Sequence, residues 1–356
     1  MISTISLAED RLRRMSHRGL RIAVVVPCFN VEDQLVEVAQ SIPDSVHYVI
    51  LVNDCSRDGT RKLIDQMSGG RTIGIHLDQN RGVGGAVMAG FQRACELGAD
   101  VIVKLDGDGQ MDSRYIPLLV EPLLTGKADY AKGNRFRSVL SLGEMPTTRR
   151  IGNAVLSLWT KLASGYWNIF DPTNGYIAVR REVVEMLPSK LIHRRYFFES
   201  SMLIVLGILG AVVVDVPMVA RYRTEKSNLR ISKALIEFPL RLTAGLIRRI
   251  WLRKILYSLA MEAVLGGFGL ALLFAGALFG VVEFIRYALI ERLPAPAGTV
   301  MTAALPVFLG FQMLMNAILL DIQSVPSTPL CEKLAERYTS EIHPGVTAGS
   351  SFSQGF

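Results

Sequence analysis

Residues 101–110 read VIVKLDGDGQ, a short apolar run followed directly by two aspartates. The run Val101–Leu105 is rich in β-branched residues and has the length of a buried strand in a parallel sheet. Three similar runs precede it, and stretches with a helical pattern separate them: Ile22–Pro27, Tyr48–Val52 and Thr72–Leu77 as strands, and Val31–Ser41, Thr60–Met67 and Gly84–Leu97 as helices. This alternation predicts an α/β fold with a mostly parallel sheet and right-handed crossovers.

Each predicted strand ends in polar or turn residues. These ends are Pro27–Asn30, Asn53–Asp54, Asp78–Asn80 and Asp106–Asp108. In open parallel sheets, ligands bind beyond the carboxyl ends of the strands, where the strand order reverses. We therefore expect one ligand site that collects these four strand ends.

The two aspartates after the fourth strand form a DxD motif that suits a divalent cation. Asp106 and Asp108 flank a glycine, so both carboxylates can approach one ion, and Gln110 adds a neutral oxygen. Mg²⁺ or Mn²⁺ prefers such oxygen ligands and completes its shell with substrate phosphates. The position of the motif at a strand end predicts a site for a metal and a diphosphate.

Two further segments at this edge have polar or glycine-rich sequences. Asp54 stands at the end of the second strand and could accept hydrogen bonds from a base or ribose, whereas Asp58 or Thr60 would suit a helix cap. The glycine-rich turn at 80–86 places Arg81 and backbone amides where they could face a phosphate or a sugar. The chain has neither GxGxxG nor GxxxxGK[ST], which argues against a nicotinamide dehydrogenase and a P-loop NTPase.

The C-terminal third is strongly apolar in a chain that is 50% hydrophobic and 20% charged. Ala263–Val282 carries no charge, and neither does the longer run Leu293–Leu320. About 20 apolar residues cross a bilayer, so two transmembrane helices are predicted, with a buried helical hairpin of a soluble domain as the alternative. Two spans return the chain to its starting side. Basic residues directly before the first span place that side in the cytosol: Arg248, Arg249, Arg253 and Lys254.

The positive charge of the chain is concentrated in one segment. Of a net charge of +7, residues 221–254 hold an excess of +8, so the remainder is nearly neutral and nucleic acid is not an expected partner. Lys233–Ile255 has a basic amphipathic pattern, which predicts two helices broken near Pro239 that lie in the headgroup layer. An ordinary surface helix is the alternative.

These patterns divide the chain into five parts. We expect a flexible N-terminus at 1–19, a catalytic domain at 20–230, amphipathic interfacial helices at 231–255, two transmembrane helices at 256–321 and a mobile cytosolic tail at 322–356. Residues 1–19 contain four arginines and no apolar run, unlike a secretory signal. The four cysteines form no CxxC pair, which favours a reducing compartment.

Five motifs in order along the chain resemble one family. They are VVVPCFN at 24–30, NDCSRDGT at 53–60, NRGVGGA at 80–86, DGDGQ at 106–110 and GNRF at 133–136. Together they are similar to family-2 glycosyltransferases with the GT-A fold. With the basic amphipathic segment and two spans, the chain resembles the polyprenyl-phosphate glycosyltransferases, the group of dolichyl-phosphate mannose synthase and bactoprenol glucosyltransferases.

The resemblance implies roles for individual residues. The base and ribose would contact Pro27, Asn30, Asn53 and Asp54, and the donor would also contact Arg81, Gly82 and Asp106. Asp106, Asp108 and Gln110 would hold Mg²⁺ or Mn²⁺ on the diphosphate, and Asp108, Arg135 and Asp171 would act in catalysis. Phosphate and acceptor contacts would come from Arg149, Arg150, Arg221, Lys226 and Ser227.

Two positions depart from the family pattern. Many relatives have an acidic residue directly after the first-strand Asn, where this chain has Val31 and places Glu32 one residue later. The QxxRW motif of processive relatives is absent, and the nearest stretch reads HRRYF at 193–197. The resemblance therefore implies a single transfer for each acceptor.

The implied activity is an inverting, metal-dependent transfer of one hexose from a nucleotide-sugar to undecaprenyl or dolichyl phosphate at the cytosolic membrane face. An acceptor with a lipid hydroxyl is an alternative, which would need Asp171 as a general base. A non-catalytic membrane scaffold that binds nucleotide-sugars is another. A channel is disfavoured because neither span carries a charge. The spans would also suit packing between copies in a homo-oligomer.

Overall fold

The structure is a computed structural model, which describes residues 8–9, 12, 19–135, 147–219 and 231–333. A seven-stranded sheet forms its centre, in the order β3-β2-β1-β4-β6-β5-β7. The strands are β1 (Ile22–Cys28), β2 (Tyr48–Asn53), β3 (Thr72–His76), β4 (Val101–Lys104), β5 (Tyr130–Asn134), β6 (Ile177–Arg180) and β7 (Val213–Pro217).

The first four strands are parallel, as predicted. β1 pairs with β2 on one side and with β4 on the other, and β2 pairs with β3. The strand order therefore reverses between β1 and β4, which places a crevice beyond their carboxyl ends. β6 runs antiparallel to both β4 and β5, whereas β5 and β7 are parallel. The sheet is mostly parallel, and the prediction of an α/β fold is confirmed.

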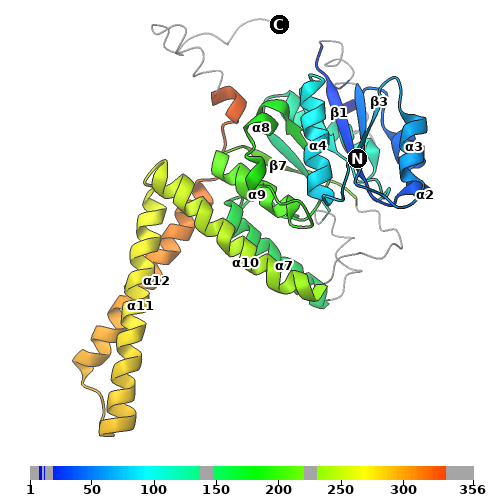
Figure 1. The fold of residues 1–356 in the computed structure, drawn as a ribbon. Coiled ribbons are helices and arrows are strands. Elements are labelled where there is room, and N and C mark those ends of the chain that lie inside the picture. The colour runs from blue at the N-terminus through cyan, green and yellow to red at the C-terminus, as the bar shows by residue number, and fades with distance from the viewer. Residues whose placement is uncertain (1–7, 10–11, 13–18, 136–146, 220–230, 334–356) are drawn as a thin grey trace, which may run out of the picture.

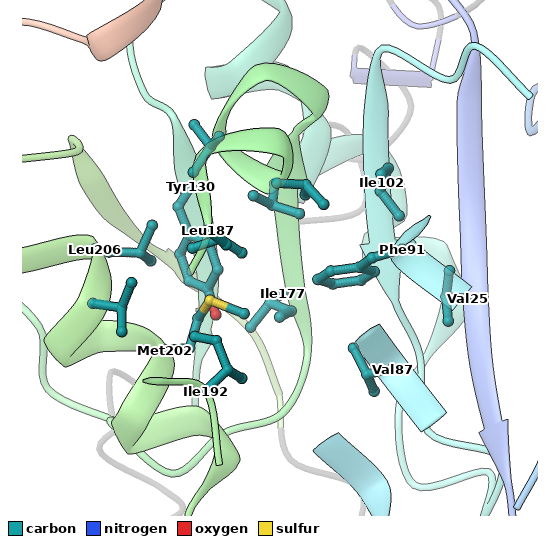
Figure 2. Close-up of a cluster of buried hydrophobic side chains, with 14 of the residues drawn as sticks. Val25, Val87, Phe91, Ile102, Tyr130, Ile177, Leu187, Ile192, Met202 and Leu206 are labelled. Atoms are coloured by element: carbon teal, nitrogen blue, oxygen red, sulfur yellow. The ribbon is translucent and has the colours of Figure 1, made fainter. Parts of the chain in front are cut away.

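Helices cover both faces of the sheet. One face carries α2 (Glu32–Ser41), α3 (Thr60–Met67) and α5 (Ile116–Leu124), and the other carries α4 (Val83–Glu96), α8 (Arg181–Met186) and α9 (Phe198–Leu209). Successive β1 side chains serve the two cores alternately, because side chains of a strand alternate between faces. Val25 packs with Phe91 and Ile102 in the core shown in Figure 2, and Val24 packs with Leu35 in the other.

Two long helices lie on one side of the part that contains the sheet (Figure 1). These are α7 (Thr147–Ser164) and α10 (Ile231–Arg249), and both pack against α9. Leu242 of α10 is fully buried with Phe197 and Ile204. A Cβ at Gly245 would lie 2.5 Å from Ile204 Cδ1, so glycine permits this close helix approach. The predicted break near Pro239 is wrong, because α10 continues through Pro239 and its geometry changes only at the π-helical segment η3 (Ile250–Leu256).

A helical hairpin projects away from the sheet (Figure 1). Its first arm is α11 (Met261–Phe284), continued by the π-helical η4 (Ile285–Glu291), and its second arm is α12 (Ala297–Gln323). Both arms are long and apolar enough to cross a membrane, and few of their residues are buried inside the protein. They meet where Gly269 and Gly310 allow close backbone approach. The predicted spans correspond to these two candidate membrane helices.

A buried ionic cluster joins the hairpin to the part of the protein that contains the sheet. The Arg249 guanidinium donates to both Asp321 oxygens at 2.8 and 3.0 Å, and Trp167 Nε1 donates to Asp321 Oδ2 at 3.0 Å. Lys254 lies 3.5 Å from Asp321 Oδ1 and also pairs with Glu262. Arg249 and Lys254 are therefore committed to this cluster and are not free surface charges, unlike what the sequence suggested.

Two terminal stretches differ from the expected flexible ends. The Leu330 amide donates to both oxygens of the buried Asp129 at 3.0 and 2.9 Å, and its side chain is buried. The expectation of a mobile tail is therefore wrong for the described residues at its start. Near the other end, Leu12 is buried in the core that contains Leu35.

Candidate active site

The loops after β1, β2 and β4 meet at the carboxyl edge of the sheet. The Asp54 amide donates to the Cys28 carbonyl at 2.9 Å, which joins the ends of β1 and β2. A Cβ at Gly107 would lie 3.2 Å from the Pro27 carbonyl, so the loop after β4 passes close to the end of β1. Asn80, at the end of the third predicted strand, also donates to the Asp54 carbonyl at 3.1 Å, so all four predicted strand ends adjoin this edge of the sheet.

The DxD motif follows β4 at this edge of the sheet. Asp106 and Asp108 are both partly exposed, and Gln110 is exposed. Asp106 Oδ1 forms an ion pair with Lys104 Nζ at 2.8 Å, and Asp108 Oδ1 accepts a hydrogen bond from the Gln110 amide at 3.0 Å. Gly109 adopts φ +69°, which favours glycine and lets the chain turn after the motif.

The donor set at this motif fits a cation that shares its ligands with a substrate. Among the residues that the structure describes, no group of three or more His, Cys, Asp or Glu side chains could hold a metal. Two carboxylates and one amide oxygen leave positions that diphosphate and water can fill, as Mg²⁺ sites with nucleotides require. The side chains present suit a metal that arrives with a diphosphate.

Asp54 is built into the turn that begins α4. Its two oxygens accept hydrogen bonds from the Arg81 amide at 2.6 Å and the Gly82 amide at 2.8 Å. Burial raises the pKa of the Asp54 carboxyl, although both amide bonds act in the opposite direction. Gly82 has φ +77°, and a Cβ there would lie 2.7 Å from the Arg194 carbonyl. Asp54 therefore fixes the glycine-rich turn, and contact with a ribose stays a prediction.

Two asparagines shape the neighbouring loops. Asn53 accepts from the Ser56 amide at 3.0 Å and its Nδ2 lies 3.3 Å from His76 Nδ1. Asn30 is exposed, adopts φ +53° and accepts from the Arg57 amide at 2.9 Å. Pro27 is partly buried beside them. These contacts hold the loops after β1 and β2 together at the place predicted for a base and ribose.

Glu32, which stands one residue after the acidic position of many relatives, bonds to the loop before α3. Its carboxylate accepts a hydrogen bond from the Gly59 amide, and its own amide donates to Asp58 Oδ2 at 3.2 Å. Glu32 thus ties the start of α2 to the loop before α3.

Arg135 and Asp171 form a pair across the loops that follow β5 and α7. Arg135 Nε donates to Asp171 Oδ2 at 2.8 Å and Nη2 donates to Oδ1 at 3.1 Å. Asp171 is fully buried, whereas about a third of the Arg135 side chain is exposed. This bidentate geometry orients the guanidinium. It favours a role for Asp171 in holding Arg135 over a direct role as a base.

The remaining predicted phosphate contacts are described only in part. Arg149 and Arg150 belong to the first turn of α7, and their side chains are not among the described groups. Arg221, Lys226 and Ser227 lie outside the described residues. Arg81 is exposed at the start of α4. The Gly85 amide of α4 donates to the Arg194 carbonyl at 3.1 Å, so the stretch HRRYF at 193–197 borders the start of this helix.

Three buried charged residues near the site were not predicted. Lys104 and Lys132 are fully buried on β4 and β5, and Glu199 is largely buried at the start of α9. Lys132 donates to the Asn174 carbonyl, and burial lowers its pKa to about 8. A lysine inside the apolar run VIVKL was a readable signal for Lys104, whereas nothing local marked Glu199.

Comparisons with known proteins agree with this geometry. Residues 23–187 match the family described as "Glycosyl transferase family 2". A UDP-N-acetylglucosamine–dolichyl-phosphate N-acetylglucosaminyltransferase of Methanococcus voltae is 29% identical over 62% of this chain and 92% of its own length. An undecaprenyl-phosphate mannosyltransferase of Micrococcus luteus is 29% identical over 56% of this chain and 83% of its own.

One solved structure shows a similar fold. Mannosyl-3-phosphoglycerate synthase from Rubrobacter xylanophilus superimposes with a TM-score of 0.50 at 17% identity, over 67% of this chain and 76% of that one. The likeness concerns the fold alone.

Proposed function

We propose that the chain is a family-2 glycosyltransferase with the GT-A fold, and that it transfers one hexose from a nucleotide-sugar to polyprenyl phosphate. The observation that supports this most is the DxD motif at the point where the strand order reverses, in a chain that also has two candidate membrane spans. The similar proteins from Methanococcus and Micrococcus carry names with polyprenyl-phosphate acceptors.

The chemistry is an inverting substitution at the anomeric carbon. An oxygen of the lipid phosphate attacks that carbon, the bond to the donor's β-phosphate oxygen breaks, and the nucleoside diphosphate leaves. A lipid monophosphate is largely ionised near neutral pH, so the attack needs no general base. This fits the arrangement in which both Asp171 oxygens are occupied by Arg135.

The protein's task is to stabilise the charge that develops on the leaving diphosphate. A divalent cation held by Asp106, Asp108 and Gln110 would supply Lewis-acid neutralisation there. Arg135, oriented by Asp171, would bring a guanidinium to a phosphate group. Pro27, Asn30 and Asn53 would border the base and ribose.

Membrane association would bring the lipid phosphate to this site. Leu240, Ala244 and Ile247 of α10 and Trp251 of η3 are exposed on one outward side, and they follow one another at helical spacing. The opposite side of α10 packs against α9 through Leu242 and Gly245. The helix therefore has apolar side chains on its buried side and on its exposed side. We place its outward side in the headgroup layer, with the catalytic part in the cytosol.

A donor panel tests the activity. Membranes that contain the protein are incubated with polyprenyl phosphate, Mg²⁺ or Mn²⁺ and radiolabelled UDP- and GDP-sugars. We expect label in lipid from one donor, its loss with excess EDTA, and its loss in Asp108→Asn. Full transfer in EDTA would contradict the metal dependence.

The same experiment distinguishes a transferase from a non-catalytic scaffold. Such a scaffold would bind a nucleotide-sugar and transfer label from no donor, and Asp108→Asn would leave its membrane function unchanged.

A further inference from the structure

Lys104 lies in the floor of the proposed donor site between two carboxylates. Its Nζ is 2.8 Å from Asp106 Oδ1 and 3.2 Å from Glu199 Oε1. Only 1% of the Lys104 side chain is exposed, and Glu199 reaches it from the first turn of α9, 95 residues along the chain. The ammonium group thus connects the end of β4 to α9 beneath the site.

The loop before β6 is shaped around this cluster. A Cβ at Gly175 would overlap Lys104 Nζ and would lie 3.1 Å from both Asp106 Oδ2 and Glu199 Oε1. Three charged groups, two from the end of β4 and one from α9, therefore converge on a position where no side chain fits. Such convergence fixes each of them more tightly than an isolated pair would.

The two oxygens of Asp106 have different surroundings. Oδ1 is the oxygen that pairs with the lysine, and no hydrogen bond to Oδ2 is found among the described residues. A carboxylate held through one oxygen cannot rotate freely, so its second oxygen keeps a defined direction.

We propose that Lys104, itself held by Glu199, is a positioning residue that orients the Asp106 carboxylate toward the metal and nucleotide of the donor. This inference rests on the proposed function, because it presumes that Asp106 contacts a nucleotide-sugar. Lys104 and Glu199 act through Asp106 and do not touch the substrate. Outer contacts of this kind change metal affinity by about 10- to 100-fold when they are removed.

Nucleotide binding to three variants of the full chain in detergent tests the proposal. The variants are Lys104→Met, Glu199→Gln and the double variant, and calorimetry measures the Kd of UDP and of GDP with Mn²⁺. We expect Lys104→Met to weaken binding by about 10- to 100-fold and Glu199→Gln to weaken it less. Because Glu199 acts through Lys104, the double variant should bind no more weakly than Lys104→Met.

A matched control separates positioning from a general loss of stability. Arg71 donates to the carbonyls of Ile42, Pro43 and Val46, away from the DxD motif. Arg71→Met should lower the thermal midpoint and leave the Kd unchanged. Glu199→Gln should raise the Kd with a midpoint close to that of the wild type.

The outcomes distinguish a failure of the proposed function from a failure of the positioning role of Lys104. Wild-type protein that binds neither nucleotide with Mn²⁺ would refute the proposed function. A wild type that binds, together with Lys104→Met that binds equally well, would overturn the positioning role alone, and so would additive losses in the double variant. If Lys104→Met does not fold, a Glu199→Gln Kd equal to that of the wild type overturns it.

Discussion

Asp171 forms a bidentate pair with Arg135 and so fixes the direction of the Arg135 guanidinium. It is fully buried and both of its oxygens accept from Arg135, whose guanidinium is partly exposed at the site. Asp171→Asn keeps the shape but removes the charge, so the guanidinium loses its fixed direction. Because small misplacements at a reacting centre cost about 100-fold, we expect a fall of that order in kcat/KM.

The control for this variant is Asp100→Asn. Asp100 pairs with Arg181 and with the Arg21 amide just before β4 begins, at the amino edge of the sheet. Steady-state kinetics should show little change for Asp100→Asn. Unchanged turnover in Asp171→Asn would contradict a role in orienting Arg135.

Lys132 predicts a pH dependence of stability. Burial lowers its pKa to about 8 from the 10.5 of an exposed lysine, so between these values the unfolded chain binds more protons than the folded one. Stability conferred by this group therefore rises with pH in that window, by at most about 1.4 kcal/mol per pH unit. Compared with Lys132→Met, the wild-type free energy of unfolding should rise from pH 8 to pH 10. Parallel curves for both proteins would contradict this assignment.

Single residues show where sequence reasoning succeeds and where it stops. Asp106 and Asp108 could be predicted because strand, turn and carboxylates are consecutive in the chain. The partner of Asp106 could not be predicted completely, since Glu199 comes from a helix 95 residues beyond Lys104. The pairing of Arg135 with Asp171 was not predicted either, because the two residues are 36 positions apart in the chain, although each was predicted to belong to the site.

At the scale of elements, α10 is the clearest test of membrane contact. Leu240 and Ile247 of α10 are 67 and 63% exposed on its outward side, and Trp251, in the η3 segment that continues α10, is 59% exposed. Tryptophan favours the membrane interface, so Trp251 should lie near the lipid carbonyls. In a Trp159→Phe/Trp167→Phe background, lipids that carry a quencher close to the headgroup should quench its fluorescence more than lipids labelled at the chain end.

Absence of quenching by either lipid would show that α10 faces water. A Trp251→Phe protein in the same background reports any fluorescence that does not come from Trp251.

Elements also differ in how well their sequence predicts them. β1 to β4 and α2 to α4 follow local patterns, and their observed bounds lie within a residue or so of the predicted ones. β5, β6 and β7 carry weaker local patterns, and the antiparallel position of β6 depends on long-range pairing with β4. The helix through Pro239 was mispredicted because tertiary packing by Leu242 and Gly245 supports the helix on the far side of the proline.

For the whole molecule, the cluster around Asp321 joins the helical hairpin to the part of the protein that contains the sheet. Arg249 and Lys254 are 3 and 5% exposed in their side chains and share this carboxylate. Asp321→Leu leaves Arg249 buried without its ion pair, and breaking such a pair costs about 3–5 kcal/mol. We expect chemical unfolding in detergent to show a loss of this order.

The double variant Arg249→Met/Asp321→Leu should recover part of that stability, because it leaves no unpaired guanidinium. If Asp321→Leu is as stable as the wild type, the cluster does not support the junction.

The most direct test of the whole account is the chemical nature of the lipid product. Purified protein in lipid vesicles is given the labelled nucleotide-sugar it uses, polyprenyl phosphate and Mn²⁺, and the product is treated with mild acid. The account predicts a sugar linked through a phosphodiester, released by the acid and absent with Asp108→Asn. An acid-stable glycolipid, or no labelled lipid from any UDP- or GDP-sugar, would contradict it.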